Sequence, residues 1–386
     1  MSMDFDRILN RRDSDCIKWN FYGEDVLPLW VADMDFISPE PVIRALQERV
    51  AQGVFGYGKD PQELREVIVA RMAERYGWKV SPEALVFTPG VVVGFNLACH
   101  AFVKPGEGAL VQTPVYPPFL SAPKNAGIRR DEMELTRQAD GRYVVDMDRM
   151  DAAITESTRL FILSNPHNPV GRVFTRKELE DMADVCLRKK VLICSDEIHG
   201  DLIFSGHQHV PIASLSSEIE AQTITMLAPS KTYNIAGLEC SVAIIPNPEL
   251  RKRYEAARGG VVGGVNILGV TAAEAAYRSG EPWLRSALEY LEGNCDFLMK
   301  YVHERLPEIQ MAAPEGTYLA WLDCRALPIE TSPADFFLEK ARVGLNDGAD
   351  FGRGGQGFVR LNFGCPRATL KAALERMQGA VESIRK

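Results

Sequence analysis

The sequence predicts an α/β protein in which a mainly parallel sheet lies between helices, together with a smaller α+β domain. Over the first two thirds of the 386 residues, short hydrophobic runs alternate with longer helical patterns, as expected of strands joined by helices. After about residue 265 this alternation stops, and long helical patterns are followed by isolated strand patterns. A chain of this length usually forms more than one core, so we expect two domains.

The predicted strands of the larger domain are hydrophobic almost without interruption, which is typical of strands that are covered on both faces. They lie at 84–89, 108–114, 159–166, 191–198, 223–230 and 241–246. A helix is expected to begin at Thr175, because Thr175 and Glu178 have the spacing of a capping box.

The last third of the chain predicts a different arrangement. We expect helices at 266–279 and 281–305, strands at 317–324 and 357–366, and a closing helix from about Ala368. The first 45 residues carry too little pattern for a domain of their own. We therefore predict an N-terminal segment (1–45) that packs on the small domain, a large domain (46–280) and a small C-terminal domain (281–386).

Composition and charge exclude several classes of protein. Hydrophobic residues make up 46% and charged residues 25%, which is the balance of a globular protein. The net charge is −8 and no stretch is strongly basic, so we expect neither nucleic acid nor an anionic membrane as a partner. There is no apolar run of about 18 residues and no signal-peptide pattern. The eight cysteines form no Cys-x-x-Cys pair, which favours a reduced, cytoplasmic compartment.

Two polar residues follow hydrophobic runs and are candidates for chemistry. Lys231 lies in APSKTYNIAGL (228–238), and a desolvated amine at a strand end can attach to the aldehyde of a cofactor. Asp196 lies in SDEIHGDL (195–202), and a buried carboxylate needs a cation, such as the protonated pyridine nitrogen of a cofactor. Taken alone, Lys231 would more simply be a surface lysine, and Asp196 a helix cap or a structural ion pair.

Three further motifs are weaker signals. LSNPHNPVGRVF (163–174) predicts a rigid turn that could present the amide of Asn168 to a ligand. Gly90, in FTPGVVVG (87–94), precedes a helical pattern whose first backbone N–H groups could hold a phosphate. Tyr116, in TPVYPPF (113–119), could lie flat on a planar ligand. Ordinary turn chemistry and core packing are the alternative interpretations.

Together and in this order, these segments resemble the fold-type I pyridoxal 5′-phosphate (PLP) enzymes of the aspartate aminotransferase superfamily, over nearly the whole chain. The narrower resemblance is to the MalY/PatB family of cystathionine β-lyases and cysteine-S-conjugate β-lyases. It is carried by LPLWVADMDF (27–36), FGYG (55–58), NPHNPVGRVF (165–174), SDEIH (195–199), SKTYNIAGLECS (230–241) and FVRLNFGCPR (358–367).

The resemblance implies PLP as cofactor, bound to the large domain, and a role for each matching residue. Lys231 would carry the cofactor and move the Cα proton of an amino-acid substrate. The other cofactor contacts would be Asp196 at the pyridine nitrogen, Asn168 at the ring hydroxyl, Tyr116 on the ring face, and Gly90, the amides of Val91 and Val92, and the Ser230 hydroxyl at the phosphate. Arg360 would bind the substrate carboxylate, with Ala32 and Asn168 beside it.

The resemblance also implies a homodimer, in which Tyr57 reaches the phosphate of the neighbouring subunit. Two positions depart from the aspartate aminotransferase pattern. His199 stands where a tyrosine is usual, and we count it among the cofactor contacts. Glu239 stands where an arginine usually binds the phosphate, so backbone amides, hydroxyls and Tyr57 must hold that group. No metal is expected, because His207 and His209 share a loop without an evident third ligand.

The reaction implied is α,β-elimination on L-cystathionine or another cysteine S-conjugate, which gives a thiol, pyruvate and ammonia. Tyr116 and Lys231 are both candidates for the acid that assists the departing thiolate. An aminotransferase, which would use the same lysine to return the proton elsewhere, is the first alternative. A non-enzymatic binding or regulatory protein on the same fold is the second.

Overall fold

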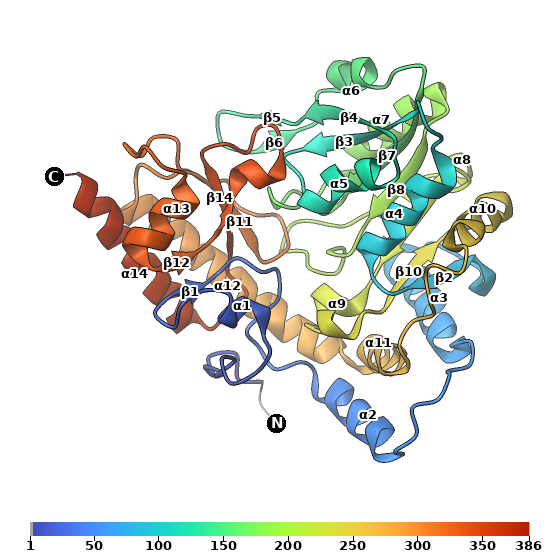
Figure 1. Ribbon diagram of the computed structural model, residues 1–386, viewed down its shortest axis with the longest axis horizontal. Helices are drawn as coiled ribbons and strands as arrows, with labels where there is room; N and C mark the ends of the chain where they lie inside the picture. Colours follow the sequence, from blue (N-terminus) through green and yellow to red (C-terminus); the bar gives the residue numbers. More distant parts are fainter. Residues whose placement is uncertain (1–2, 386) are drawn as a thin grey trace.

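The computed structural model describes residues 3–385, and its centre is a seven-stranded sheet (Figure 1). In spatial order the strands are β2 (Leu85–Thr88), β10 (Ser241–Ile244), β9 (Thr223–Leu227), β8 (Leu192–Asp196), β7 (Thr158–Ser164), β3 (Gly108–Thr113) and β4 (Arg129–Glu134). Only β10 runs antiparallel to its neighbours, so the prediction of a mainly parallel sheet is confirmed. β4 was not predicted, because it is a polar, largely exposed edge strand.

Helices cover both faces of this sheet, which explains the continuous hydrophobic runs. On one face α4 (Val91–Phe102), α5 (Pro117–Asn125) and α10 (Pro248–Arg258) pack over alternate residues such as Val111 and Ile162. The intervening residues, such as Leu110 and Phe161, pack under α6 (Met147–Ala153) and α7 (Arg176–Lys189). α3 (Gln62–Tyr76) and α11 (Ile267–Ser279) close the β2 edge. The capping box of Thr175 and Glu178 is present at the start of α7.

A second core is built from the last third of the chain. The antiparallel strands β11 (Leu319–Asp323), β14 (Phe358–Asn362) and β13 (Asn346–Asp347) pack against α12 (Glu281–Arg305) and α14 (Arg367–Ile384). The two strands and three helices predicted here are confirmed, and β13 was missed because it has only two residues. The remaining elements are α1 (Ile17–Asn20), β1 (Leu27–Pro28), α2 (Glu40–Ala51), β5 (Thr136–Arg137), β6 (Tyr143–Val144), α8 (Ser217–Glu220), α9 (Pro229–Thr232), α13 (Pro333–Phe336) and β12 (Val343–Gly344).

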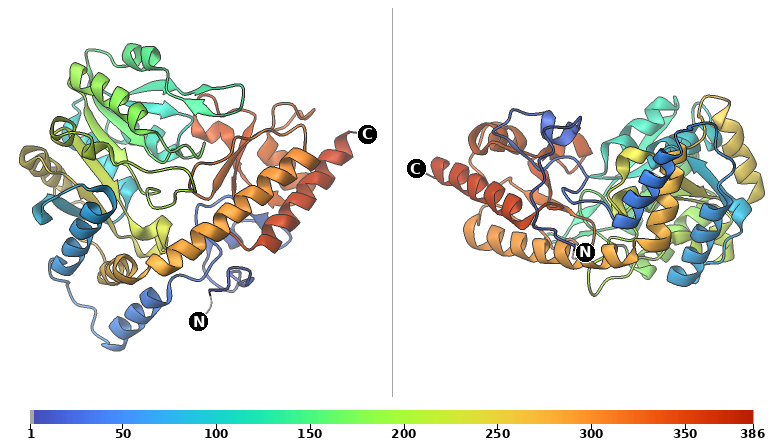
Figure 2. Two further views of the ribbon diagram at one scale, coloured as in Figure 1. Left: turned by 180° about the vertical axis from the view of Figure 1, so that it is seen from behind. Right: turned by 90° about the horizontal axis from the view of Figure 1, so that it is seen from below.

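The N-terminal segment lies beside this second core (Figure 2). β1 pairs in parallel with β12, and the side chains of Phe5, Leu29 and Met34 belong to the same hydrophobic cluster as β11 and β14. The domain limits at 45 and 280 stay a prediction.

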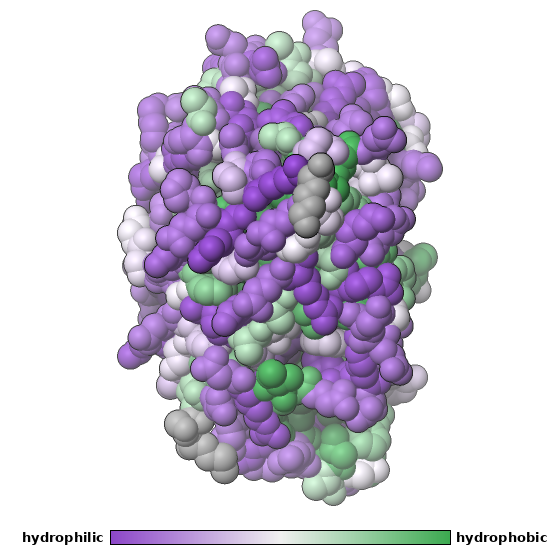
Figure 3. All heavy atoms as spheres, turned by 90° about the vertical axis from the view of Figure 1, so that its left-hand side faces the viewer, coloured by the Kyte–Doolittle hydropathy of each residue, from purple (hydrophilic) through white to green (hydrophobic). Residues whose placement is uncertain are grey.

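The face on the side of α14 is covered mainly by hydrophilic side chains, with small apolar patches between them (Figure 3). Among residues 3–385, no helix combines the length and the apolar character that crossing a bilayer requires.

Candidate active site

A cavity of about 580 Å³ opens where the carboxyl ends of β7 and β8 meet the starts of α4 and α9. Ligand sites of parallel α/β sheets usually lie at this edge. The predicted site residues that line the cavity are Ala32, Gly90, Val91, Val92, Tyr116, Asn168, Asp196, His199, Ser230, Lys231 and Arg360. They come from separate parts of the sequence, and the fold brings them together.

Lys231 lies in α9, the short helix that follows β9. Its Nζ donates a hydrogen bond to the main-chain oxygen of Ala32 at 2.8 Å. Burial, helped by the charge of Arg360 and opposed by Asp33 and Asp196, lowers the pKa of Lys231 to about 8. A much larger share of this amine is therefore neutral near pH 7 than of an ordinary lysine.

Asp196 is the last residue of β8 and is buried. Its Oδ1 accepts a hydrogen bond from the backbone N–H of Ile198 at 3.0 Å. Burial raises the pKa of Asp196 to about 7, because no cation pairs closely with this carboxyl group within the described residues. A buried carboxyl group without a cation is costly to keep charged and suits a positively charged ligand group.

Arg360 lies in the middle of β14 and is the second cation of the cavity. One Nη donates to Asn168 Oδ1 at 3.0 Å, and the other donates to the Trp30 oxygen at 2.9 Å and to Asn346 Oδ1 at 2.7 Å. Nε has no partner among the described residues. Burial lowers the pKa of Arg360 to about 10, and the groups that oppose this shift are the phenols of Tyr116 and Tyr318. The guanidinium is held in place by neutral oxygens and retains donor capacity for a carboxylate.

The opposite part of the cavity is formed by the start of α4. Gly90 has a φ of 134°, a conformation that favours glycine, and its N–H donates to Ser241 Oγ at 3.0 Å. Val91 and Val92 are the first residues of the helix, so their N–H groups have no intrahelical acceptor. With Ser230 beside them, these amides form a site of the kind that binds phosphate.

Tyr116 and His199 also line the cavity, as do the polar residues Ser164, Glu239 and Asn346. Burial raises the pKa of the Tyr116 phenol, so the hydroxyl keeps its proton at neutral pH. Burial lowers the pKa of His199 to about 3, so its ring is neutral, and its Nδ1 has no hydrogen-bond partner within residues 3–385. His199 packs edge-on against Tyr318, with ring centroids 6.1 Å apart.

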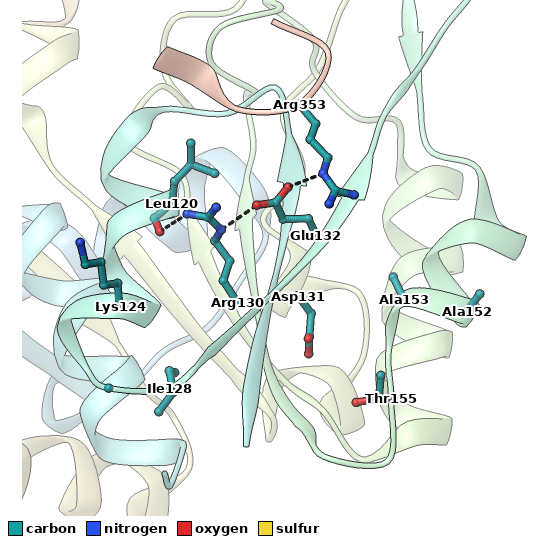
Figure 4. Close-up of a pocket in the computed structure, with 11 residues that line it drawn as sticks. Leu120, Lys124, Ile128, Arg130, Asp131, Glu132, Ala152, Ala153, Thr155 and Arg353 are labelled. Atoms are coloured by element: carbon teal, nitrogen blue, oxygen red, sulfur yellow. Dashed lines mark hydrogen bonds and ion pairs between the residues drawn. The ribbon is translucent and has the colours of Figure 1, made fainter. Parts of the chain in front are cut away.

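Tyr57 is the one predicted site residue that does not line this cavity. Its side chain is fully exposed and lies beside a different hollow, of about 1130 Å³, with Phe55 and Arg258. A third hollow, of about 700 Å³, lies beside β4 and α5 (Figure 4). There Glu132 pairs with Arg130 at 2.7 Å and with Arg353 at 3.2 Å. These charged side chains form ion pairs with one another, whereas, among residues 3–385, those of the cavity around Lys231 do not.

Sequence reasoning missed two residues that hold this cavity together. Asn346 binds Arg360, and Tyr318 donates to the Ala32 oxygen at 2.9 Å. Asn346 lies in a two-residue strand that leads into a short 3₁₀ helix, and in the sequence an asparagine close to a glycine usually signals only a turn. Tyr318 lies at the start of a hydrophobic run, where core packing is the ordinary interpretation. The neighbouring residues in the sequence give no indication that either side chain contributes to the cavity.

Comparisons with known proteins agree with this geometry. Residues 24–377 match the family described as "Aminotransferase class I and II". The chain is 41% identical to "Cystathionine beta-lyase PatB" of Bacillus subtilis, over 98% of this chain and 100% of that one. The crystal structure of OvoB has a TM-score of 0.94 at 46% identity, covering 98% of this chain and 99% of OvoB. Cystalysin from Treponema denticola, whose crystal structure contains PLP, has a TM-score of 0.95 at 34% identity, with both chains fully covered.

Proposed function

The chain belongs to the class I and II aminotransferase family, and from this premise we propose that it is a PLP-dependent carbon–sulfur β-lyase. Its substrates would be L-cystathionine or other cysteine S-conjugates, which it would cleave by α,β-elimination to a thiol, pyruvate and ammonia. The similarity to PatB supports this choice within the family, because PatB is named a cystathionine β-lyase and matches over its whole length.

One observation in the cavity carries the proposal: its buried charges lack close partners of opposite sign. Asp196 lies next to no pairing cation, and Lys231 and Arg360 form no ion pair with a carboxylate in the described part of the chain. A ligand that brings both a cationic ring nitrogen and anionic groups would compensate all three. PLP together with an amino acid is such a ligand pair.

The residues present fit PLP. Asp196 would bind the pyridine nitrogen, Asn168 the ring hydroxyl and Tyr116 the ring face. The amides of Val91 and Val92 and the hydroxyl of Ser230 would hold the phosphate, and Lys231 would hold the aldehyde carbon. When bound, PLP supplies an electron sink that makes the Cα–H bond of the amino acid acidic. His199 would lie among these cofactor contacts as a neutral ring.

The protein's own groups would then divide the remaining work. Arg360 binds the substrate carboxylate, with Asn168 in contact with its guanidinium, and Ala32 lines the same cavity with its oxygen against Lys231. Lys231, whose depressed pKa leaves a useful share of neutral amine, takes the proton from Cα. The Cβ–S bond breaks with its electron pair on sulfur. The thiolate gains a proton from Tyr116, whose phenol is protonated at neutral pH, or from the newly protonated Lys231. The unsaturated amino acid that remains is released and reacts with water, which gives pyruvate and ammonia.

We further propose that the enzyme is a cytoplasmic homodimer. Tyr57 is fully exposed and does not line the cavity of its own chain, as expected of a residue that reaches the phosphate of a partner subunit. Phe55 and Val54 beside it are also exposed, with 59% and 70% of their surface accessible. An apolar strip of this kind favours contact with a second copy.

The proposal is tested by mixing the PLP-loaded protein with L-cystathionine and S-substituted cysteines, without any 2-oxo acid, and measuring pyruvate. We expect catalytic pyruvate release, and its loss in Lys231→Ala, because both the cofactor link and the base are removed. Fast transamination with added 2-oxo acid, together with no pyruvate from any thioether, would instead assign the protein as an aminotransferase.

A further inference from the structure

The wall of the cavity that carries Trp30 and Ala32 is an irregular segment, residues 30–36, without helix or strand. Side chains from distant parts of the chain donate to nearly every main-chain oxygen of this segment. The pairs are Arg360 to Trp30, Asn362 to Val31 and Asp33, Lys231 and Tyr318 to Ala32, and Asn234 to Met34 and Phe36. The position of this segment therefore decides where two acceptors of the active site lie.

Two acids of the segment belong to an ionic cluster, which we define as Arg11, Lys18, Asp33 and Asp35. Lys18 has no exposed surface, and its Nζ lies 2.8 Å from Asp35 Oδ2 and 3.4 Å from Asp33 Oδ1. The same Nζ donates to the main-chain oxygen of Asp33 at 3.2 Å. Arg11 contacts both carboxylates. Two cations thus neutralise two acids that flank Met34 in the segment.

The cluster is also tied to aromatic residues on either side. Trp19 Nε1 donates to Asp35 Oδ1 at 2.8 Å, and Trp30 Nε1 donates to the main-chain oxygen of Lys18 at 3.2 Å. Trp30 is thus held by Lys18 through its ring, while its own main-chain oxygen holds Arg360. A chain of direct contacts therefore runs from the main-chain oxygen of Lys18 through Trp30 to the guanidinium of Arg360. The amine of Lys18 holds the same segment through Asp33 and Asp35.

A buried ion pair is weak evidence for stability, since desolvation of the charges offsets most of their attraction. Such clusters are better explained where they specify one arrangement of the chain. We propose that Lys18 is a positioning residue of the active site. By binding Asp33 and Asp35 it fixes segment 30–36, so that the oxygens of Trp30 and Ala32 meet Arg360 and Lys231.

This inference rests on the proposed β-lyase activity and names a residue outside the cavity that supports it. If the segment shifts, Arg360 loses one of its three oxygen acceptors and Lys231 loses the acceptor of its amine. Displacements of about 1 Å in such groups commonly cost up to roughly 100-fold in rate or affinity. We expect the loss mainly in substrate binding, because Arg360 is the carboxylate ligand.

The first test replaces Lys18. In Lys18→Met an uncompensated carboxylate is left buried, so the variant is expected to be less stable. Lys18→Met/Asp35→Asn removes one charge of each sign and should regain most of the stability. We expect both variants to bind PLP with normal stoichiometry but to show KM for a thioether substrate raised about tenfold or more, with a smaller change in kcat.

The second test uses a matched pair that leaves every charge in place. Trp19→Phe removes one indole-to-carboxylate hydrogen bond within the cluster, and Trp78→Phe removes an equivalent bond to Glu220, of 2.7 Å, far from the cavity. Trp19→Phe should raise KM by a few-fold. Trp78→Phe should leave KM unchanged at a similar loss of thermal stability.

A second measurement does not depend on turnover: the dissociation constant of glycine, determined by calorimetry on PLP-loaded protein. Glycine has the amine and carboxylate of a substrate but no leaving group. We expect this dissociation constant to rise in parallel with KM.

Wild-type KM and glycine affinity in the folded double variant, or equal effects of Trp19→Phe and Trp78→Phe, would overturn the proposal. If the lysine variants do not fold, the tryptophan pair decides. Absence of pyruvate from the wild-type protein would refute the lyase activity, and glycine binding would still test Lys18.

Discussion

At the level of single residues, the cavity holds three groups whose pKa values burial moves toward neutrality. Burial lowers the pKa of Lys231 to about 8 and that of Arg360 to about 10, and it raises the pKa of Asp196 to about 7. Each pKa shifts because burial disfavours the charged form of a group that has no close partner of opposite sign. These groups are therefore prepared for a ligand that supplies the missing charges.

The shift of Lys231 predicts the pH dependence of cofactor loading. Only the neutral amine reacts with an aldehyde, so the rate at which apoprotein takes up PLP should rise with pH and level off above about 8. An unperturbed lysine would reach this plateau only above about 10.4. Stopped-flow absorbance of apoprotein mixed with PLP measures the rate. A rate still rising tenfold per pH unit at pH 9.5 would contradict the assigned pKa.

Arg360→Lys should mainly weaken substrate binding. An ammonium cannot reproduce the planar fork that contacts Asn168, Asn346 and Trp30 while binding a carboxylate. We expect KM to rise between about 10- and 100-fold, with a smaller change in kcat. Arg353→Lys is the matched control, since Arg353 is largely exposed and pairs with Glu132 outside the cavity. Equal KM values for the two variants would show that Arg360 does not bind the substrate carboxylate.

At the level of elements, the topology of the sheet and its helices places the site residues at one edge of the sheet. Asp196 ends β8 and Lys231 follows the neighbouring parallel strand β9, so they reach the same edge of the sheet. Gly90 ends the turn that leads from β2 into α4 and exposes the first amides of that helix. The elements thus determine which residues meet, before any side-chain contact is considered.

The cap of α7 provides a test of an element that lies outside the site. Thr175 accepts a hydrogen bond from the N–H of Glu178, whose side chain in turn accepts from the N–H of Thr175. Thr175→Ala should lower the free energy of unfolding by about 1 kcal/mol. Urea denaturation of the apoprotein measures this change. Thr175→Ser keeps the hydroxyl and should retain most of the stability, and KM should be normal in both variants.

At the level of the whole molecule, we propose that each site draws on a second subunit. Tyr57 lines a hollow beside α11, not the cavity that contains Lys231, and its side chain has no shielding from its own chain. If Tyr57 acts on the partner's phosphate site, each active site draws on two chains. The same arrangement would place the exposed Val54 and Phe55 in the interface.

Mixed dimers test this arrangement. Lys231→Ala should be inactive, and Tyr57→Phe should lose activity when PLP is limiting. If Tyr57 acts across the interface, unfolding and refolding an equal mixture should form hybrids with one intact site. Roughly a quarter of the wild-type activity would then return at limiting PLP. No gain over the sum of the separate variants would show that Tyr57 does not act across subunits.

Most strands of the main sheet and two residues of the site could be predicted from local sequence patterns. Continuous hydrophobic runs predicted six of the seven strands of the main sheet, and the polar residues at their ends made Asp196 and Lys231 candidates, which the structure places in one cavity. This works because burial on both faces imposes hydrophobicity residue by residue, and because parallel strands end at a common edge. The charged edge strand β4 escaped prediction, since its exposed side chains carry no such pattern.

Only the tertiary structure decided how the site is held. The contact of Arg360 with the Trp30 oxygen joins residues 330 positions apart, and that of Asn234 with Met34 spans 200 positions. Lys18 looks like a surface lysine in the sequence, yet it is fully buried between two acids. Such contacts involve main-chain oxygens, which every residue possesses, so no local pattern marks them. They arise only when segment 30–36 packs against α9 and the residues after it on one side and against β14 on the other.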